Sequence, residues 1–396
     1  MEMMVLISGG GIGGLALALG IARHGFRSII FEKRKEFGEI GAGIQLAPNA
    51  FHALDYLGVG DAVREIAVCI DNLRLMDALS GKEISRIPLG EDFRKRFKNP
   101  YAVVHRGELY SVLLKACQDC KLVDLRPSSE VVAYKKNSER VTAILANGLQ
   151  VTGKALIGAD GLRSNIRKQL LDDGVPRVSG HTTYRSVIPV EDMPEELRWN
   201  AATLWAGPKC HIVHYPLSDW KFFNLVATCQ NGASEAISGK PVSHEKVKKS
   251  FEHITELPRQ IIEKGKEWKL WVLCDRDPVD QWVDGRVALL GDAAHPMLQY
   301  FAQGACMALE DAVAVSYAFE MMADNIEDAL LAYQEMRKLR TARVQLQSRE
   351  LGNHVYHPEG AHAELRNKIM SSHSTEKWYS VIDWLYNSNG IESRSS

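Results

Sequence analysis

Three features are scarce in this sequence: long apolar runs, an excess of one charge, and clustered cysteine. Among its 396 residues, no apolar run approaches the roughly 20 residues of a transmembrane helix. The net charge of −1 at pH 7 provides no overall field that would recruit nucleic acid. The seven cysteines are scattered, and the C-x-x-C of Cys117 and Cys120 lacks a second pair. We therefore expect no membrane, nucleic-acid or metal partner.

A basic leader, an internal repeat and a low-complexity linker are also missing. The apolar residues 4–8 lead directly into a glycine-rich turn, so we interpret them as a first strand and not as part of a signal peptide. Scattered thiols favour a reducing, cytoplasmic location. With 45% hydrophobic and 24% charged residues, the composition is typical of a globular protein of two or three domains.

The first motif is a glycine-rich turn between a strand and a helix. Gly9, Gly11 and Gly14 form G-x-G-x-x-G, residues 15–24 have helical spacing, and Glu32 closes the next strand. The glycines let the backbone approach a pyrophosphate, whose charge the helix start receives, and Glu32 can accept hydrogen bonds from ribose hydroxyls. The motif predicts dinucleotide binding, but it does not distinguish FAD from NAD.

Two further junctions carry polar side chains at the end of a strand. Arg106 lies between the strand 101–105 and a helix, where an arginine can hold a phosphate. The buried strand 155–158 ends on an Asp-Gly turn that contains Asp160, and a helix follows. We expect both residues to lie near the nucleotide.

A third junction, at residues 291–296 (Gly-Asp-Ala-Ala-His-Pro), lies between an apolar strand and the helix 305–319. The start of that helix has unpaired backbone N–H groups and a partial positive charge. This arrangement suits a polar cofactor on which negative charge develops. The candidate contacts are Asp292, Pro296, Gly304 and Ala305.

Together and in this order, the three motifs resemble those of the single-component FAD-dependent aromatic hydroxylases, which include the 4-hydroxybenzoate and salicylate hydroxylases. The resemblance covers nearly the whole chain. It implies bound FAD, with NADH, or else NADPH, as a visiting co-substrate. It places Arg106 and Asp292 at the flavin nucleotide, Asp292 at the ribityl chain. The partners it implies are a small aromatic acid and O₂, and a homodimer is an option.

Local stretches narrow the resemblance. Residues 208–217, 298–300 and 383–385 are similar to those of the 3-hydroxybenzoate 6-hydroxylases, in which Gln299 replaces the proline of most relatives. The spacing of His211 and Tyr215 also resembles that of 6-hydroxynicotinate 3-monooxygenases, and salicylate 1-hydroxylases are a third alternative. Outside this class, an FAD-dependent oxidoreductase that inserts no oxygen stays open. The W-x-W-x-I-P motif of halogenases is absent.

Four residues are candidates for catalysis. In a strand, His211 and Tyr215 project from the same face. The resemblance implies that a ring carbon para to a phenol hydroxyl attacks a flavin C4a-hydroperoxide, which would convert 3-hydroxybenzoate to 2,5-dihydroxybenzoate (gentisate). We expect His211 to assist ionisation of the phenol and Gln299 to orient its hydroxyl. Tyr215, helped by Tyr101, would hold the carboxylate.

The predicted fold is α/β: a Rossmann-like FAD-binding domain, an interleaved β-sheet substrate domain, and a C-terminal helical region. Residues 178–274 contain alternating strands, more aromatics and no nucleotide motif, which separates them from their flanks. The predicted boundaries follow. The FAD-binding domain takes 1–72, 100–177 and 275–345; the substrate domain takes 73–99 and 178–274; the helical tail takes 346–396.

Overall fold

The N-terminal strand lies at the centre of a parallel sheet. In the computed structural model, which describes residues 4–38, 42–388 and 390–391, β1 (Met4–Ser8) pairs in parallel with β2 (Arg27–Phe31) and β12 (Ala155–Gly158). The apolar side chains of β1 are buried, as is typical of a strand covered on both faces. The sheet continues outward through β8 (Val123–Arg126), β20 (Val287–Leu289) and antiparallel β19 (Val283–Asp284), in the order β19-β20-β12-β1-β2-β8.

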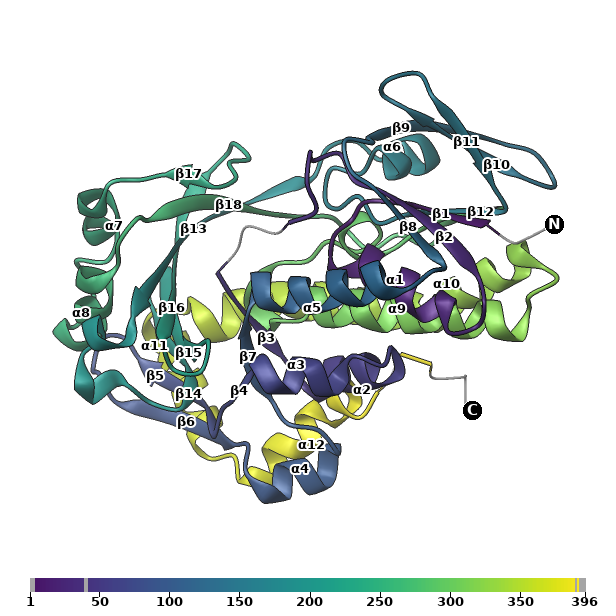
Figure 1. The fold of residues 1–396 in the computed structure, drawn as a ribbon. Helices are drawn as coiled ribbons and strands as arrows, with labels where there is room; N and C mark the ends of the chain where they lie inside the picture. Colours follow the sequence, from purple (N-terminus) through teal and green to yellow (C-terminus); the bar gives the residue numbers. More distant parts are fainter. Residues whose placement is uncertain (1–3, 39–41, 389, 392–396) are drawn as a thin grey trace.

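Helices cover this sheet. One side holds α1 (Ile12–Ala22), α5 (Arg106–Asp119), α9 (Gly304–Met321) and α10 (Ile326–Leu351), with α1 packed between α5 and α9 (Figure 1). The other side holds α6 (Asn165–Leu171) and the small sheet of β9 (Val131–Lys136), β10 (Val141–Leu145) and β11 (Gln150–Gly153). The α/β fold class predicted from the sequence is thereby confirmed.

A second, eight-stranded sheet lies beside the first unit (Figure 1). Its strand order is β17-β18-β13-β16-β15-β14-β5-β6, antiparallel except for the parallel pair β14 and β5. In chain order its strands are β5 (Asn72–Asp77), β6 (Glu83–Pro88), β13 (Arg177–Pro189), β14 (Ala201–Gly207), β15 (Cys210–Leu217), β16 (Phe222–Ala233), β17 (Lys240–Pro241) and β18 (Lys269–Asp275). These strands lie in residues 72–88 and 177–275, so two segments far apart in the sequence build one sheet. That this unit binds substrate stays a prediction.

Shorter elements connect and cover these sheets. A small sheet, β3-β7-β4, lies between the two units (Figure 1). The connecting elements are β3 (Gly43–Leu46), β4 (Val68–Cys69), β7 (Ala102–His105), α7 (His244–Ser250), α8 (Glu256–Lys264), and the 3₁₀ turns Val190–Asp192 and Glu195–Leu197.

The sequence spacing predicts one helix over residues 51–66, and this prediction is wrong. The structure contains two helices, α2 (Pro48–Tyr56) and α3 (Gly60–Ile66). Gly58 lies between them with a φ of +79°, a left-handed conformation that commonly ends a helix. The apolar periodicity continues across this break because both helices bury one face.

The C-terminal region returns to the rest of the molecule. The helix α12 (Thr375–Tyr386) packs on α4 (Glu91–Phe97), where Tyr379 and Tyr386 contact Phe93 and Phe97 edge to face. Before it come a π-helical turn at Gly352–Tyr356 and α11 (Gly360–Ser371). The predicted boundary at 345/346 falls inside α10, which continues to Leu351. Residue 389 and residues 392–396 of the predicted tail lie outside the described residues.

No helix in the described ranges is both long and apolar enough to cross a membrane.

His214 illustrates how the large sheet constrains a polar side chain. It points from β15 to the face opposite His211 and is fully buried, and neither ring nitrogen has a hydrogen-bond partner among the described residues. Burial, with a contribution from Arg74, lowers the pKa of its imidazole to about 3. The folded chain therefore holds His214 neutral at every physiological pH.

This burial predicts a pH-dependent stability. Below the unfolded pKa of about 6.5, the unfolded chain binds a proton that the folded chain refuses, so stability falls from pH 6.5 toward pH 3. His214→Leu should flatten the slope of unfolding free energy against pH by up to about 1.4 kcal/mol per unit in this window. Urea unfolding at pH 7.5, 6.5 and 5.5 measures it, with the exposed His362→Leu as control. Parallel curves for His214→Leu and wild type would contradict the assignment.

Candidate active site

A cavity of about 1270 Å³ lies between the parallel sheet, the start of α9 and one face of the large sheet. It is larger than the roughly 300–1,000 Å³ of most small-molecule sites. Residues from the motifs at 9–14, 158–164 and 291–296 form one end, and residues from β15 form another. The volume is therefore sufficient for a dinucleotide and a small ring together.

The glycine turn at the start of the chain has two kinds of glycine. A Cβ at Gly9 would lie 2.3 Å from the carbonyl oxygen of Ala159, and one at Gly14 would lie 2.0 Å from that of Gly9. These two glycines allow the chain to pack against itself. Gly11 differs because it lines the cavity and a Cβ there would meet nothing within 4 Å. Gly11 is thus the place where a ligand can approach the backbone closely.

Glu32 lies at the end of β2 beside this turn. One carboxylate oxygen accepts a hydrogen bond from the Gly10 N–H at 2.9 Å, and the other accepts one from the Arg34 N–H at 2.9 Å. Glu32 therefore holds the turn in place. Each oxygen has a second lone pair, so contact with a ribose stays a prediction.

Asp160 and Pro296 have structural partners in the chain itself. The Asp160 carboxylate accepts hydrogen bonds from the Ser164 hydroxyl and from the Asn165 N–H, which fixes the start of α6. The Pro296 carbonyl accepts a hydrogen bond from Gln345 at 3.1 Å. The residues that line the cavity beside them are Ala159, Gly161, Asp292 and Met297. A direct cofactor contact by Asp160 or Pro296 stays a prediction.

Asp292, Gly304, Ala305 and Arg106 all line the cavity. Their contact with a cofactor stays a prediction. Burial raises the pKa of the Asp292 carboxyl, while His295 and Arg106 lower it in part. Within the described part of the chain, Asp292 has no hydrogen-bond or ion-pair partner. A carboxylate without a partner can accept hydrogen bonds from the hydroxyl groups of a ligand. The start of α9 beside it can stabilise negative charge that develops on the same ligand.

A buried charge network supports this turn. Asp311 accepts hydrogen bonds from the Gly291 N–H at 2.9 Å and from His295 Nε2 at 2.5 Å, and Arg337 donates to its other oxygen at 2.7 Å. Burial alone would raise the pKa of Asp311, but His295 and Arg337 outweigh it and hold the pKa at about 2. The charge pattern of residues 326–348 predicts a helix that is either solvated or packed against the core. The helix is packed at Arg337, whose side chain is fully buried.

His211 and Tyr215 project from one face of β15 into the cavity, as predicted from their spacing. His211 is 1% exposed, and its Nδ1 lies 2.7 Å from Nε2 of His357. The rings of Tyr300 and Tyr356 contact it edge to face. Burial lowers the pKa of His211 well below its usual value, and His357 and His181 add to this effect. His211 is therefore neutral near pH 7.

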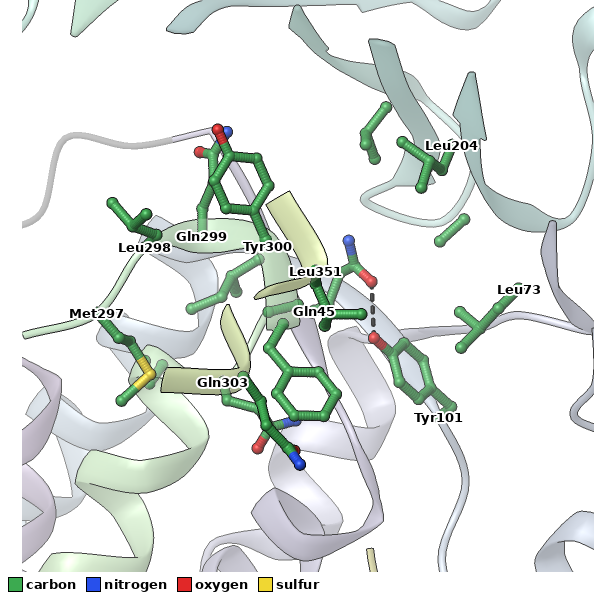
Figure 2. A pocket seen from close by; sticks show the side chains of 18 of the residues that line it. Gln45, Leu73, Tyr101, Leu204, Met297, Leu298, Gln299, Tyr300, Gln303 and Leu351 are labelled. Atoms are coloured by element: carbon green, nitrogen blue, oxygen red, sulfur yellow. Dashed lines mark hydrogen bonds between the residues drawn. The ribbon is translucent and has the colours of Figure 1, made fainter. Parts of the chain in front are cut away.

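Gln299 and Tyr101 also line the cavity, but both already have partners. The Tyr101 hydroxyl donates to the side-chain oxygen of Gln45 at 2.7 Å (Figure 2). The side-chain oxygen of Gln299 accepts a hydrogen bond from Arg185 at 2.9 Å, and its nitrogen donates to Thr183 and Thr228 at 3.0 Å each. Their predicted roles toward a substrate stay predictions, because the polar groups of both side chains already form hydrogen bonds within the chain.

Sequence reasoning missed several residues of the site. His357 follows the π-helical turn after α10, and no motif marks it. Arg185 lies within β13, and which face of that strand meets the cavity cannot be assigned without its pairing to β16. Helix α10 also contributes lining residues, namely Arg343, Gln347, Glu350 and Leu351. Only the alternation of residues along β13 carried a signal for Arg185.

Comparisons with known proteins identify the family of this chain. The family model described as "FAD binding domain" matches residues 2–348. The chain is 53% identical to "3-hydroxybenzoate 6-hydroxylase 1" of Aquipseudomonas alcaligenes over 99% of both chains. It is 45% identical to "3-hydroxybenzoate 6-hydroxylase" of Polaromonas naphthalenivorans (strain CJ2), over 98% of this chain and 96% of that one.

Solved structures share the fold at lower identity. A salicylate hydroxylase in a substrate complex superposes with a TM-score of 0.84 at 24% identity, covering 100% of this chain and 99% of that one. Klebsiella pneumoniae HpxO, complexed with FAD and uric acid, superposes with a TM-score of 0.84 at 23% identity, covering 97% of this chain and 96% of that one.

The environment of Asp292 predicts its effect on FAD. Asp292→Ala should weaken FAD binding by about 1.5–3 kcal/mol, because it removes a hydrogen bond to a charged group. Fluorescence titration of FAD into the apoprotein measures the loss. Asp61→Ala, on the exposed surface of α3, is the charge-matched control. Equal FAD affinity in Asp292→Ala and wild type would show that the carboxylate does not contact the cofactor.

Proposed function

Since this chain belongs to the FAD binding domain family, among the single-component aromatic hydroxylases that include the 3-hydroxybenzoate 6-hydroxylases, we propose that it hydroxylates 3-hydroxybenzoate. The hydroxyl group would enter para to the existing one and yield 2,5-dihydroxybenzoate, with NADH and O₂ consumed. The observation that carries this proposal is the 53% identity over 99% of the chain, together with a cavity that holds His211 and Tyr215 at its ring end.

The residues of the motif end fit FAD. Gly11 offers open space to the pyrophosphate, Arg106 lines the same cavity, and Asp292 has no partner in the described chain. The start of α9 would stabilise negative charge on the ring system. FAD, when bound there, supplies the activated oxygen and accepts the electrons of NADH.

His211 is proposed to accept the proton of the substrate hydroxyl. It can do so at Nε2 only if Nδ1 carries the ring hydrogen, which then donates to Nε2 of His357. His357 would thus position the tautomer. Because burial lowers the pKa of His211, complete transfer from a resting phenol is uphill. We infer that His211 would take up the proton during hydroxylation, because the hydroxyl becomes more acidic as the ring loses electron density.

Tyr215 is proposed to bind the carboxylate, with Tyr101 nearby. Apolar side chains close the cavity around the ring position, among them Leu73, Leu204 and Leu351 (Figure 2). Their role would be to exclude water, which would otherwise divert the activated oxygen to hydrogen peroxide.

A substrate panel tests the proposed function. Purified protein with FAD should oxidise NADH fastest with 3-hydroxybenzoate, and the product should be one oxygen heavier. Salicylate and 6-hydroxynicotinate are the matched competitors, and NADPH is the matched reductant. NADH oxidation without a hydroxylated product would favour an oxidoreductase that inserts no oxygen. Faster turnover of 6-hydroxynicotinate or salicylate would shift the assignment to that substrate.

The two strand residues should fail in different ways. His211→Ala removes assistance to phenol ionisation, so hydroxylation should fall by roughly 10²–10⁴ while flavin reduction continues. NADH consumption should then exceed product, with hydrogen peroxide making up the difference. Tyr215→Phe should instead weaken substrate binding by about 1.5–3 kcal/mol. Wild-type rate and coupling in His211→Ala would make His211 a structural histidine.

A further inference from the structure

We propose that Arg185 is the anchor for the carboxylate of the aromatic acid, acting together with Tyr215. This inference rests on the proposed function in one respect, because it takes the ligand to be an aromatic acid. It adds a residue that neither the motifs nor the resemblance indicates. Its role would be to select acids over neutral phenols of the same shape.

Arg185 has no acidic partner. It lines the cavity, and among the described residues no carboxylate lies within ion-pair distance of its guanidinium. Its Nε is buried and has no hydrogen-bond acceptor. Burial lowers the pKa of the guanidinium, an effect that Arg106 increases and Tyr215 opposes. An enclosed cation without a counter-ion is costly, so the geometry calls for an anion in the cavity.

Among the described residues, the two most deeply buried arginines have carboxylate partners: Arg337 binds Glu310 and Asp311, and Arg167 binds Asp173. Arg366, at 6% exposed, donates instead to neutral oxygens of Asn367 and Val355. Arg185 has neither a carboxylate partner nor an acceptor for its Nε among the described residues, and it lies on the wall of the cavity, where a ligand can supply the missing charge.

The guanidinium is held in a defined orientation. Its Nη2 donates to Gln299 at 2.9 Å, and the ring of Trp271 lies 5.5 Å from its central carbon. Gln299 is in turn fixed by Thr183 and Thr228. The glutamine at this position thus supplies the acceptor that orients the arginine. A preorganised fork binds a carboxylate with less loss of entropy than a free side chain.

The sheet register places Arg185 beside the proposed ring position. Directly paired residues of antiparallel strands share a face. Arg185 pairs with Val226, which pairs with Val213, and both valines line the cavity. This row runs between the row of His211 and the row of Tyr215.

A ring lying over the two valines could therefore direct its hydroxyl to His211 and its carboxylate to the other side. Neighbouring strands are about 4.8 Å apart, so Arg185 starts two strands from Val213, and its long side chain shortens that gap. The guanidinium is close enough to Tyr215 of β15 for that residue to affect its pKa. Tyr215 would reach the same carboxylate along β15. The arginine and the tyrosine thus approach the carboxylate from two directions.

A matched pair of ligands tests the proposal. The dissociation constants of 3-hydroxybenzoate and of uncharged 3-hydroxybenzamide would be measured by perturbation of the flavin spectrum in the FAD-loaded protein. Arg185→Gln should weaken binding of the acid roughly 10- to 150-fold and leave binding of the amide within about threefold. Arg185→Lys should fall between, since a point charge replaces the fork. Arg94→Gln, on the exposed side of α4, is the control and should change neither.

Equal losses for the acid and the amide in Arg185→Gln, or no loss for either, would overturn the proposal. If Arg185→Gln does not retain FAD, Gln299→Leu takes its place: it removes the acceptor of Nη2 and should lower the acid-to-amide affinity ratio. An unchanged ratio in Gln299→Leu would then reject the role of Arg185.

The outcome is independent of turnover. If the wild-type protein binds 3-hydroxybenzoate without hydroxylating it, the proposed function fails while the ratio still judges Arg185. Should salicylate or 6-hydroxynicotinate bind more tightly, the same variants are compared with that acid and its carboxamide. Binding of no aromatic acid at all would overturn both proposals.

Discussion

The carboxylate of Asp311 is the constraint on which the site depends. It accepts hydrogen bonds from the N–H of Gly291, from Nε2 of His295 and from the guanidinium of Arg337. All of these residues are buried. Removing one partner from such a group leaves uncompensated charge in a medium that solvates it poorly. The turn that presents Asp292 to the cavity is therefore fixed by buried hydrogen bonds to Asp311 on its side away from the solvent. A cofactor with developing negative charge would meet a prearranged helix start.

The ring end is built on a different principle. His211, Gln299 and His357 come from a strand, a turn and the segment just after the π-helical turn that follows α10. Each is held by a hydrogen bond to another side chain, His211 to His357 and Gln299 to Arg185. Histidine and tyrosine rings pack around His211 and keep it neutral. Burial thus sets the protonation state here, while ion pairing sets it beneath the cofactor turn.

Prediction from the sequence succeeded where structure is local. The strand–turn–helix at Gly9 and the shared face of His211 and Tyr215 follow from periods of a few residues. It failed at Gly58, where one left-handed residue divides a continuous apolar pattern into two helices. It could not find Arg185 or His357. Their positions depend on how β13 pairs with β16 and on where α10 ends, and both are settled by contacts between distant segments.

Helix α10 joins the two ends of the site in one rigid piece. Arg337 supports the cofactor turn, and further along the same helix Arg343, Gln347, Glu350 and Leu351 line the cavity. Each added residue would turn the following part of a helix by about 100° and lengthen it by about 1.5 Å. A single insertion between Arg337 and Arg343 would therefore swing the lining residues off the cavity. The number of residues between Arg337 and Arg343 is therefore constrained by the site. This segment should tolerate substitutions far better than a change in length.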